Sequence, residues 1–305
     1  MYDCAYNHQT VRIFISTFAY MKGNVLNDFS LQTTDFSSIS NLDDVAFINE
    51  HIGMGMNVGA YRDNFIRPGQ PYRFVEGRIL WITEGSADFE LTLEEYHIKK
   101  GDIVLLAPET IMELKSCSDD YNMMGIIYKE DISVTRNIII HAGEEDWHET
   151  RRLAGILWDM ARRKPFRQET VRLLVSAIIS DIQHISRAEQ EVHQTKRKSR
   201  QEETFGKFKR LVNEHCCQYR TIPFYADRLA LTPHYLSTLI AKVSGRSVMY
   251  WINRATLIHA KVMLKSKDML VSEVADRLSF PSQSAFGSFF KRETGMSSGE
   301  YQKAD

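Results

Sequence analysis

Short polar side chains recur at helical spacing in two segments near the C-terminus of this 305-residue chain, and basic residues follow them. The polar set comprises His234, Ser237, Thr238, Gln283, Ser284 and Ser288. The basic set comprises Lys242, Arg246, Lys291 and Arg292. Side chains of the first kind can donate or accept hydrogen bonds at base edges, whereas cations suit phosphate groups. Neither segment has an Arg at its centre for a bidentate contact with guanine, so we predict modest base discrimination by each.

Both segments lie inside a duplicated pattern. The tetrapeptide Ala-Asp-Arg-Leu occurs at Ala226–Leu229 and again at Ala275–Leu278, and the two copies end at Gly245 and Gly295. Each copy predicts a short helix, a turn and a second helix with a left-handed glycine cap. One copy alone is equally typical of any small helical domain. Two copies in register favour a paired helix-turn-helix, which is a DNA-reading motif.

The second helix of each copy is expected to have a hydroxyl N-cap and an apolar stripe. Thr232, followed by Pro233, suits the first cap, and Ser282 suits the second. The stripe has i, i+3, i+4 spacing in both copies and comprises Leu236, Leu239, Ile240, Phe286, Phe289 and Phe290. Between the copies, Val248–Lys265 predicts a helix about 26 Å long, which could hold two recognition helices about one DNA turn apart.

The stretch from Phe205 to Tyr301 resembles the DNA-binding domain of the AraC/XylS family of bacterial transcription regulators. The matching residues are Phe224-Tyr225-Ala226-Asp227, Leu231-Thr232-Pro233-His234-Tyr235-Leu236-Ser237, Gly245, Trp251-Ile252, Arg254, Ala260, Leu264, Val274-Ala275, Phe280, Ser284, Phe286, Phe289-Phe290-Lys291-Arg292, Thr294-Gly295 and Tyr301. The chain departs from the family pattern at Ser279, usually Gly, and at Ser288, Ser298 and Gln302. The resemblance implies DNA contacts from His234, Ser237, Thr238, Ser284 and Ser288.

The charge distribution separates the chain into two parts. The net charge is -1, yet residues 196–305 hold 19 Lys or Arg against 10 Asp or Glu, which gives +9, and the remainder carries -10. A basic C-terminal part that follows an acidic N-terminal part suits a protein that binds a polyanion through its C-terminal part only. We therefore expect a DNA-binding domain at 204–305, with motifs at 222–245 and 271–295, behind a solvated linker at 195–203.

No window approaches the about 18 uninterrupted apolar residues of a membrane span, and the N-terminus lacks a signal pattern. We therefore expect a cytoplasmic protein without a membrane partner. The four cysteines, at positions 4, 117, 216 and 217, show no CxxC spacing. Because Cys216 and Cys217 are adjacent on a predicted helix, a mutual disulfide would be strained, and we expect reduced thiols packed as small hydrophobes.

Residues 1–143 predict a β domain, because short apolar runs alternate with glycine turns. Strands are expected at Ala46–Val58, Ile79–Thr83, Ala87–Leu91, His97–Lys99, Ile103–Ala107 and Met123–Tyr128, with turns at Glu84-Gly85-Ser86 and Gly101-Asp102. Pro68, the Ile82–Gly85 hairpin, Gly101-Asp102 and Pro108 resemble the cupin-like effector domain that precedes the DNA-binding domain in many AraC-type regulators. That resemblance implies a small-molecule effector.

The β domain lacks the ligands of a metal-dependent cupin enzyme. Such a site uses a His-x-His pair, a Glu and a later His, whereas His51 and His97 stand alone in their strands. We expect no metal, no cofactor and no catalytic residue. An effector would sit in the barrel mouth, beside side chains that could equally fill the core, namely Met54, Met56, Tyr61, Arg73, Trp81 and Met124.

Residues 144–194 predict two helices that are split near Lys164-Pro165. The second helix carries an apolar stripe suited either to a partner helix or to its own barrel. We favour the partner, because the resembled family dimerises through paired helices. The predicted dimer contacts are Val171, Leu174, Ile178, Ile182 and Ile185.

Together these features predict a two-domain α+β protein, with a cupin-like β-barrel, dimerisation helices and an all-α double helix-turn-helix domain. We expect a homodimeric, non-enzymatic regulator of the AraC/XylS type that binds double-stranded DNA, activates transcription, contacts RNA polymerase and responds to an effector. One alternative is a DNA-binding domain fused to a cysteine-dependent or cupin enzyme. Cys4 and Cys117 lie among acidic residues, which disfavour a reactive thiolate. Another alternative is a scaffold whose duplicated motif binds protein.

Overall fold

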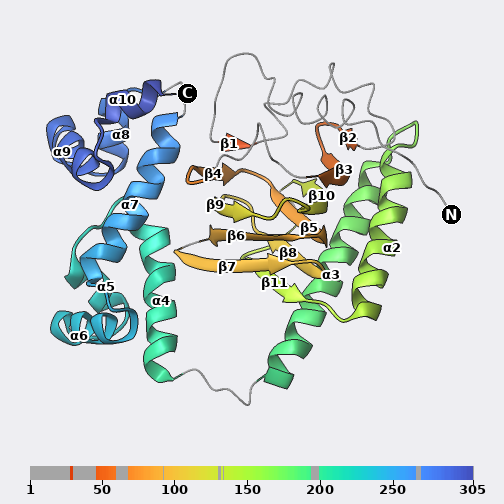
Figure 1. Ribbon diagram of the computed structural model, residues 1–305, viewed down its shortest axis with the longest axis horizontal. Helices are drawn as coiled ribbons and strands as arrows, with labels where there is room; N and C mark the ends of the chain where they lie inside the picture. The colour runs from red at the N-terminus through yellow and green to blue at the C-terminus, as the bar shows by residue number, and fades with distance from the viewer. Residues whose placement is uncertain are drawn as a thin grey trace. The chain divides into compact units, whose positions relative to one another are not determined.

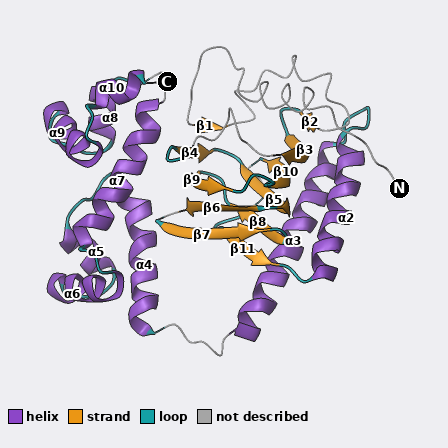
Figure 2. Cartoon of the chain, viewed as in Figure 1, coloured by secondary structure: helices purple, strands orange, loops and turns teal. Residues whose placement is uncertain are grey.

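The computed structural model describes residues 28–29, 46–59, 68–91, 93–129, 132, 134–193, 199–265 and 269–304. The chain forms two compact units, one mainly from residues before 195 and the other mainly from residues 196–305. We call them the N-terminal unit and the C-terminal unit. The first contains strands and helices, and the second is helical (Figure 1, Figure 2). The predicted two-domain α+β class is confirmed.

Two sheets make up the core of the N-terminal unit, and paired strands such as those of β5 and β10 run antiparallel. The six-stranded sheet has the order β11 (Ile138–His141), β8 (Asp102–Leu106), β5 (Gly77–Glu84), β10 (Asn122–Tyr128), β3 (Ile52–Gly59) and β2 (Ala46–Ile48). The five-stranded sheet has the order β1 (Asp28–Phe29), β4 (Pro71–Phe74), β9 (Thr110–Cys117), β6 (Ser86–Leu91) and β7 (Glu94–Lys99).

The centre of the six-stranded sheet is β10, which lies between β5 and β3. Met124 pairs with Trp81 and Ile126 pairs with Ile79, and all four side chains are buried. β5 and β6 are joined by the predicted turn at Gly85, whose φ of 67° is rarely adopted by residues with a Cβ. The turn chemistry read from the sequence therefore sets the ends of these strands.

The strand expected over Ala46–Val58 is divided into β2 and β3. The side-chain oxygen of Asn49 accepts hydrogen bonds from the backbone N–H groups of His51 and Ile52, at 2.8 and 2.9 Å. Such local bonds favour a turn over a continuous strand. The sequence also fails to predict β4, β9 and β11. In β9 the buried Met112 and Leu114 alternate with the charged Glu113 and Lys115, a period-two pattern that the sequence prediction overlooked.

Two helices, α2 (Glu144–Ala161) and α3 (Gln168–His193), pack against one face of the six-stranded sheet (Figure 1). The predicted split near Lys164-Pro165 is confirmed. Trp81 is fully buried, and its indole N–H donates to the Thr150 hydroxyl of α2 at 3.0 Å. That bond satisfies a polar group which would otherwise be costly to bury between sheet and helix.

The apolar stripe of α3 is buried within its own unit. Val171, Ile178, Ile182 and Ile185 are at most 6% exposed, and Leu174 is partly buried against the same core. The prediction of contacts with a partner subunit is therefore wrong for the four buried residues, and it stays a prediction for Leu174. Helical periodicity identifies a face that must be covered, and here the six-stranded sheet covers it.

The described residues of the C-terminal unit after position 198 form helices. These are α4 (Arg200–His215), α5 (Ile222–Arg228), α6 (Pro233–Ser244), α7 (Val248–Lys265), α8 (Val271–Arg277), α9 (Gln283–Thr294) and α10 (Ser298–Lys303). They surround two hydrophobic cores, one containing Phe208, Leu236 and Ile252 and the other containing Leu264 and Phe286. α7 contributes to both cores and so connects them. In the described stretches of the chain, no helix combines the length and apolarity needed to cross a membrane.

The predicted linker at 195–203 is too long. α4 begins at Arg200, because Ser199 and Glu202 form a reciprocal capping box. The Ser199 hydroxyl accepts from the Glu202 N–H at 3.2 Å, and the Glu202 carboxylate accepts from the Ser199 N–H at 2.7 Å. Two N–H groups at the helix start are thereby satisfied. Residues 194–198 lie outside the described part of the chain.

Candidate nucleic-acid interface

The first helix-turn-helix motif consists of α5, a tight turn and α6. In the turn, the N–H of Ala230 donates to the carbonyl of Asp227 and the N–H of Leu231 donates to the carbonyl of Ala226, both at 2.9 Å. Ala230 has a φ of 54°, a left-handed conformation that is unfavourable for a residue with a Cβ. The turn thus fixes the entry of α6 by two backbone bonds and one strained residue.

The second motif, of α8 and α9, repeats this turn bond for bond. The N–H of Ser279 donates to Asp276 and the N–H of Phe280 donates to Ala275, again both at 2.9 Å. Ser279 has a φ of 52°, almost the value at Ala230. The duplication seen in the sequence is therefore a duplication of backbone geometry, and the left-handed φ explains why glycine suits the position of Ser279.

Both recognition helices, α6 and α9, have the predicted caps. The hydroxyl of Thr232 accepts from the backbone N–H three residues ahead at 3.2 Å, and that of Ser282 does so at 3.1 Å. At the other ends, Gly245 and Gly295 have φ values of 68° and 81°. These local interactions define where each helix starts and stops, as the sequence predicts.

The repetition continues into the helix after each motif, which the sequence reading missed. Ser247 caps α7 by accepting from the Tyr250 N–H at 3.1 Å, and Ser297 caps α10 by accepting from the Glu300 N–H at 3.2 Å. The signal was available, since a serine follows each Gly cap by two residues. The repeated unit therefore comprises three helices.

The apolar face of each recognition helix is buried as predicted. The stripe residues are at most 6% exposed, and they are Leu236, Leu239, Ile240, Phe286, Phe289 and Phe290. Since a helix buries only one face here, the opposite faces of α6 and α9 must be exposed. α6 and α9 lie toward the two ends of α7 (Figure 1).

The predicted base-reading residues are on those outer faces. The exposed ones are His234, Thr238, Gln283, Ser284 and Ser288, while Ser237 is half-buried. The hydroxyl of Ser237 donates to the carbonyl of Pro233 at 2.8 Å, and that of Thr238 donates to the carbonyl of His234 at 3.1 Å. Each hydroxyl oxygen still has accepting capacity, which suits the amino groups of adenine and cytosine.

The predicted phosphate-binding residues are all exposed, and they are Lys242, Arg246, Lys291 and Arg292. The Arg292 guanidinium pairs with Glu293 at 3.0 Å and lies 5.6 Å from the centre of the Phe289 ring. The Arg246 guanidinium lies 5.0 Å from the centre of the Tyr250 ring. Exposed pairs of this kind are worth at most about 1 kcal/mol, so a phosphate can replace them.

Two further residues escape the sequence reading. Tyr235 lies beside His234 in the first turn of α6, and 48% of its surface is exposed. An exposed aromatic at the tip of a recognition helix can contact sugars or thymine methyl groups. Arg220, just before α5, donates to the carbonyl of Ser279 at 2.8 Å and lies 3.5 Å from the centre of the Phe280 ring. This contact joins the first motif directly to the turn of the second.

The predicted effector residues do not gather around one pocket within the described part of the chain. Met54, Trp81 and Met124 are at most 3% exposed and belong to the core under α2 and α3. Arg73 lies on β4, in the other sheet, and pairs with Glu109 at 3.2 Å. Two members of the predicted set lie outside what the structure describes, the side chain of Met56 and Tyr61.

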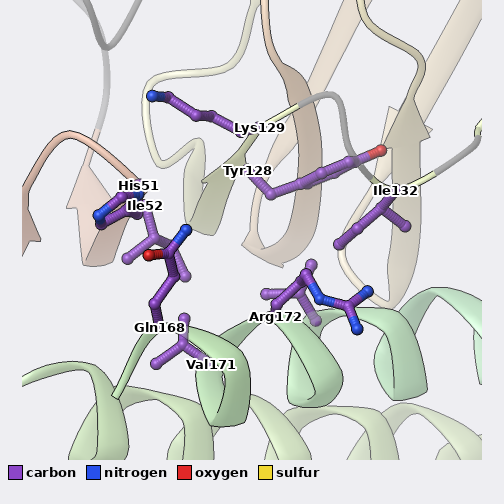
Figure 3. A pocket seen from close by; sticks show the side chains of 9 residues that line it. His51, Ile52, Tyr128, Lys129, Ile132, Gln168, Val171 and Arg172 are labelled. Carbon is purple, nitrogen blue, oxygen red and sulfur yellow. The ribbon is translucent and has the colours of Figure 1, made fainter. Parts of the chain in front are cut away.

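A pocket of the N-terminal unit lies elsewhere, between the sheet and α3 (Figure 3). Its lining consists of His51, Ile52, Tyr128, Lys129, Ile132, Gln168, Val171, Arg172 and Val175. The ring of His51 stacks on that of Phe166, and Arg172 pairs with Glu169 at 2.6 Å. None of the predicted effector residues lines it.

The thiols that the structure describes are free, and they are Cys117, Cys216 and Cys217. Cys216 is fully buried, which agrees with the expectation of a small hydrophobe. A hydrogen bond from the Cys216 thiol, together with the nearby His259 ring and against the effect of burial, lowers the pKa of the Cys217 thiol to about 5. The sequence reading considered only Cys4 and Cys117 as reactive thiols and so missed this environment.

Comparison with known proteins places the same region in a family. A family model described as "Helix-turn-helix domain" matches residues 225–304. The uncharacterized HTH-type transcriptional regulator YijO of Escherichia coli (strain K12) is 28% identical over 140 residues, which cover 46% of this chain and 48% of that protein. The HTH-type transcriptional activator RhaR of Yersinia pseudotuberculosis (strain IP 31758) is 29% identical over 79 residues, 26% of this chain and 27% of that protein.

The chain thus spans half the length or less of these curated relatives. Among solved structures, the C-terminal domain of AraT, a response regulator from Geobacillus stearothermophilus, is 25% identical, with a TM-score of 0.33 over 34% of this chain and 88% of that one. ToxT from Vibrio cholerae is 15% identical, with a TM-score of 0.37 over 78% of this chain and 95% of that one. By the match over residues 225–304 and its duplicated motif, the C-terminal part of this chain belongs to the AraC/XylS type of helix-turn-helix domain.

Proposed function

We propose that this protein is a sequence-specific transcription regulator that reads two successive major-groove segments of double-stranded DNA with α6 and α9. The observation that carries the proposal is the bond-for-bond repetition of two helix-turn-helix motifs whose polar faces are exposed. α7 has 18 residues, so it is about 27 Å long. This length is compatible with recognition helices that enter the groove about one DNA turn, about 34 Å, apart.

The charge of the chain supports a polyanionic partner at this end. Residues 196–305 carry a net charge of +9, and the exposed cations of α6 and α9 lie in their last turns. Contacts to phosphates position a protein on DNA and make its affinity fall steeply with salt. We therefore propose that phosphate contacts position the protein on DNA and supply much of its affinity, and that they come from Lys242, Arg246, Lys291 and Arg292.

We assign sequence reading to the polar residues on the exposed faces, which are His234, Ser237, Thr238, Gln283, Ser284 and Ser288. His234 is tested first, because its ring can donate and accept at the N-terminal tip of α6, where recognition helices meet base edges. Each hydroxyl contributes single and not bidentate bonds. Discrimination then accumulates over both helices.

Binding of the full chain to DNA tests this proposal. Duplexes selected from a random pool supply a preferred site, and affinities for that site and for random DNA are measured at several salt concentrations. His234→Ala should weaken binding to the preferred site by about 1–3 kcal/mol more than to random DNA. Lys291→Ala should weaken both alike and reduce the salt slope by about 1.

A matched control is Arg163→Ala, which removes one exposed positive charge from the N-terminal unit. It should leave both affinities and the salt slope unchanged. Equal affinity of the wild-type chain for selected and random duplexes would refute sequence-specific binding. Absence of DNA binding at low salt would remove the function itself and favour the scaffold alternative.

The remaining features of the regulator concern its domains, its oligomeric state and its effect on transcription. We infer that residues 1–143 form an effector domain and 204–305 the DNA-binding domain, that the chain acts as a homodimer, and that it activates transcription through RNA polymerase. A similar protein, RhaR, is described as an activator, and the small pocket of Figure 3 would have to widen to hold an effector. A thermal-shift screen of metabolites tests whether an effector binds. A reporter gene placed behind the selected DNA site tests whether the protein raises or lowers transcription.

A further inference from the structure

A cluster of two thiols and an imidazole lies where α4 meets α7, away from the exposed faces of α6 and α9. Cys216 is the C-cap of α4, Cys217 follows it, and His259 lies on α7. The two sulfur atoms and a ring nitrogen of His259 all lie within 4.8 Å of one another. The DNA-reading function uses none of these three side chains.

His259 gives an independent sign that the cluster is incomplete. Its Nε2 atom is buried and makes no hydrogen bond of good geometry with the residues that the structure describes, although the Cys217 thiol lies against the ring. Buried polar atoms in native proteins almost always have a partner, because leaving one unsatisfied is costly. A ligand bound between the imidazole and the thiols would supply that partner.

We propose that Cys216, Cys217 and His259 form a binding site for a thiophilic metal cation such as Zn²⁺. Thiolate and imidazole are the ligands that Zn²⁺ and Cu⁺ prefer, whereas Mg²⁺ and Ca²⁺ require oxygen ligands. The ligand set is two thiolates and one neutral imidazole. For Zn²⁺, a water completes four-coordination in the remaining position.

The distances support this assignment. Zn–S bonds of about 2.3 Å and Zn–N bonds of about 2.0–2.1 Å place tetrahedral ligand atoms about 3.4–3.8 Å apart. The ligand atoms here are within 4.8 Å of one another, so closure needs shifts of about 1 Å. Both thiols must lose their protons, and binding therefore releases up to two protons per cation to the solvent.

A cation bound between α4 and α7 would stabilise the C-terminal unit. Cys217 packs against both hydrophobic cores of the C-terminal unit, the one under the first motif and the one under the second. A cation at this site ties the end of α4 to α7, which runs between the motifs. Because it binds only the folded arrangement, it stabilises the C-terminal unit.

The test uses the full chain, reduced and stripped of metal with a chelator, in the absence of DNA. Co²⁺ serves as the spectroscopic probe, because coordination by thiolates produces charge-transfer absorption in the near ultraviolet. The variants are Cys217→Ser and His259→Gln, and Cys117→Ser on β9 is the matched control. Cys216 is fully buried, so its substitution is avoided.

The wild-type chain and Cys117→Ser should bind one Co²⁺ per chain with thiolate absorption, and Zn²⁺ but not Mg²⁺ should displace it. Cys217→Ser and His259→Gln should bind at least tenfold more weakly while keeping wild-type helical circular dichroism. Zn²⁺ should also raise the Tm of the wild-type chain and of the control, but not of the two variants.

The proposal fails if the folded wild-type chain gives no thiolate absorption at stoichiometric Co²⁺. It also fails if both site variants bind as tightly as the control. Both outcomes are independent of DNA binding, because the measurements contain no DNA. A chain that binds metal but not DNA would overturn the proposed function and leave the metal site standing.

Discussion

Replacing the left-handed residues in the two turns with glycine should stabilise the protein, whereas glycine usually destabilises a folded chain. Ala230 has a φ of 54° and is exposed, so Ala230→Gly removes only a methyl group that faces solvent. The left-handed conformation costs a residue with a Cβ about 1–2 kcal/mol, whereas glycine loses about 0.5–1 kcal/mol more backbone entropy on folding. Ala230→Gly should therefore stabilise the first motif by about 0.5–1 kcal/mol.

The same chemical change in the neighbouring helix should have the opposite effect. Ala241 is exposed in the interior of α6, where the backbone is helical. Ala241→Gly therefore gains no relief of strain and should destabilise the motif by about 0.5–1 kcal/mol. Ser279→Gly repeats the stabilising change in the second motif, and the backbone carbonyl that accepts from Arg220 is retained.

Amide hydrogen exchange of the full chain measures these effects locally, in α5 and α6 for the first motif and in α8 and α9 for the second. A change of about 0.5–1 kcal/mol corresponds to about two- to fivefold in exchange rate at 25 °C. Ala230→Gly should slow exchange in α5 and α6, and Ala241→Gly should accelerate it. If both substitutions shift exchange in the same direction, the assignment of strain to the turn is refuted.

Three other substitutions test separate parts of the structure. Ile178→Ala should lower the free energy of unfolding of the N-terminal unit by about 2–5 kcal/mol in urea denaturation, because the side chain is fully buried, and the mass measured by light scattering should not change. Thr232→Ala should lower the stability of α6 by about 1 kcal/mol in the same exchange experiment, because the cap is lost, and unchanged exchange would contradict the cap. Burial, with Asp146 and Glu149, raises the pKa of Asp181, so the ionised form is penalised in the folded state. Asp181→Asn should therefore raise the Tm of the N-terminal unit at pH 7, and the gain should vanish below pH about 4, where the wild-type side chain is also neutral.

Local chemistry made the helix-turn-helix motifs predictable. The caps at Thr232 and Ser282, the glycines at Gly245 and Gly295, and the apolar stripes each depend on residues fewer than a dozen positions apart. Such features are encoded by neighbouring side chains, so one sequence suffices to place them. The capping box at Ser199 is equally local, and reading it would have placed the start of α4 correctly.

The sequence-based predictions failed in two respects: which element covers an apolar helix face, and which residues far apart in the sequence are in contact. The periodicity of α3 correctly identifies the buried side of Ile178 and Ile182, but the same pattern serves a partner helix or the protein's own sheet. The contact of Arg220 with Phe280 and the cluster of Cys217 with His259 join residues far apart in the chain. No local sequence pattern predicts these contacts, because they depend on how the helices pack.

The composition of the two reading faces determines how specificity must arise. A good contact to a base contributes about 1–3 kcal/mol of discrimination, and specific binding typically exceeds non-specific binding by about 4–10 kcal/mol. These faces carry hydroxyls, one imidazole and the Gln283 amide, so only Gln283 can bind a base, adenine, through two hydrogen bonds, and no arginine of this set reads guanine. Several weak contacts from both helices must therefore be made at once. That requires a fixed spacing between the motifs, and α7 and the Arg220 contact with the second turn provide it within one chain.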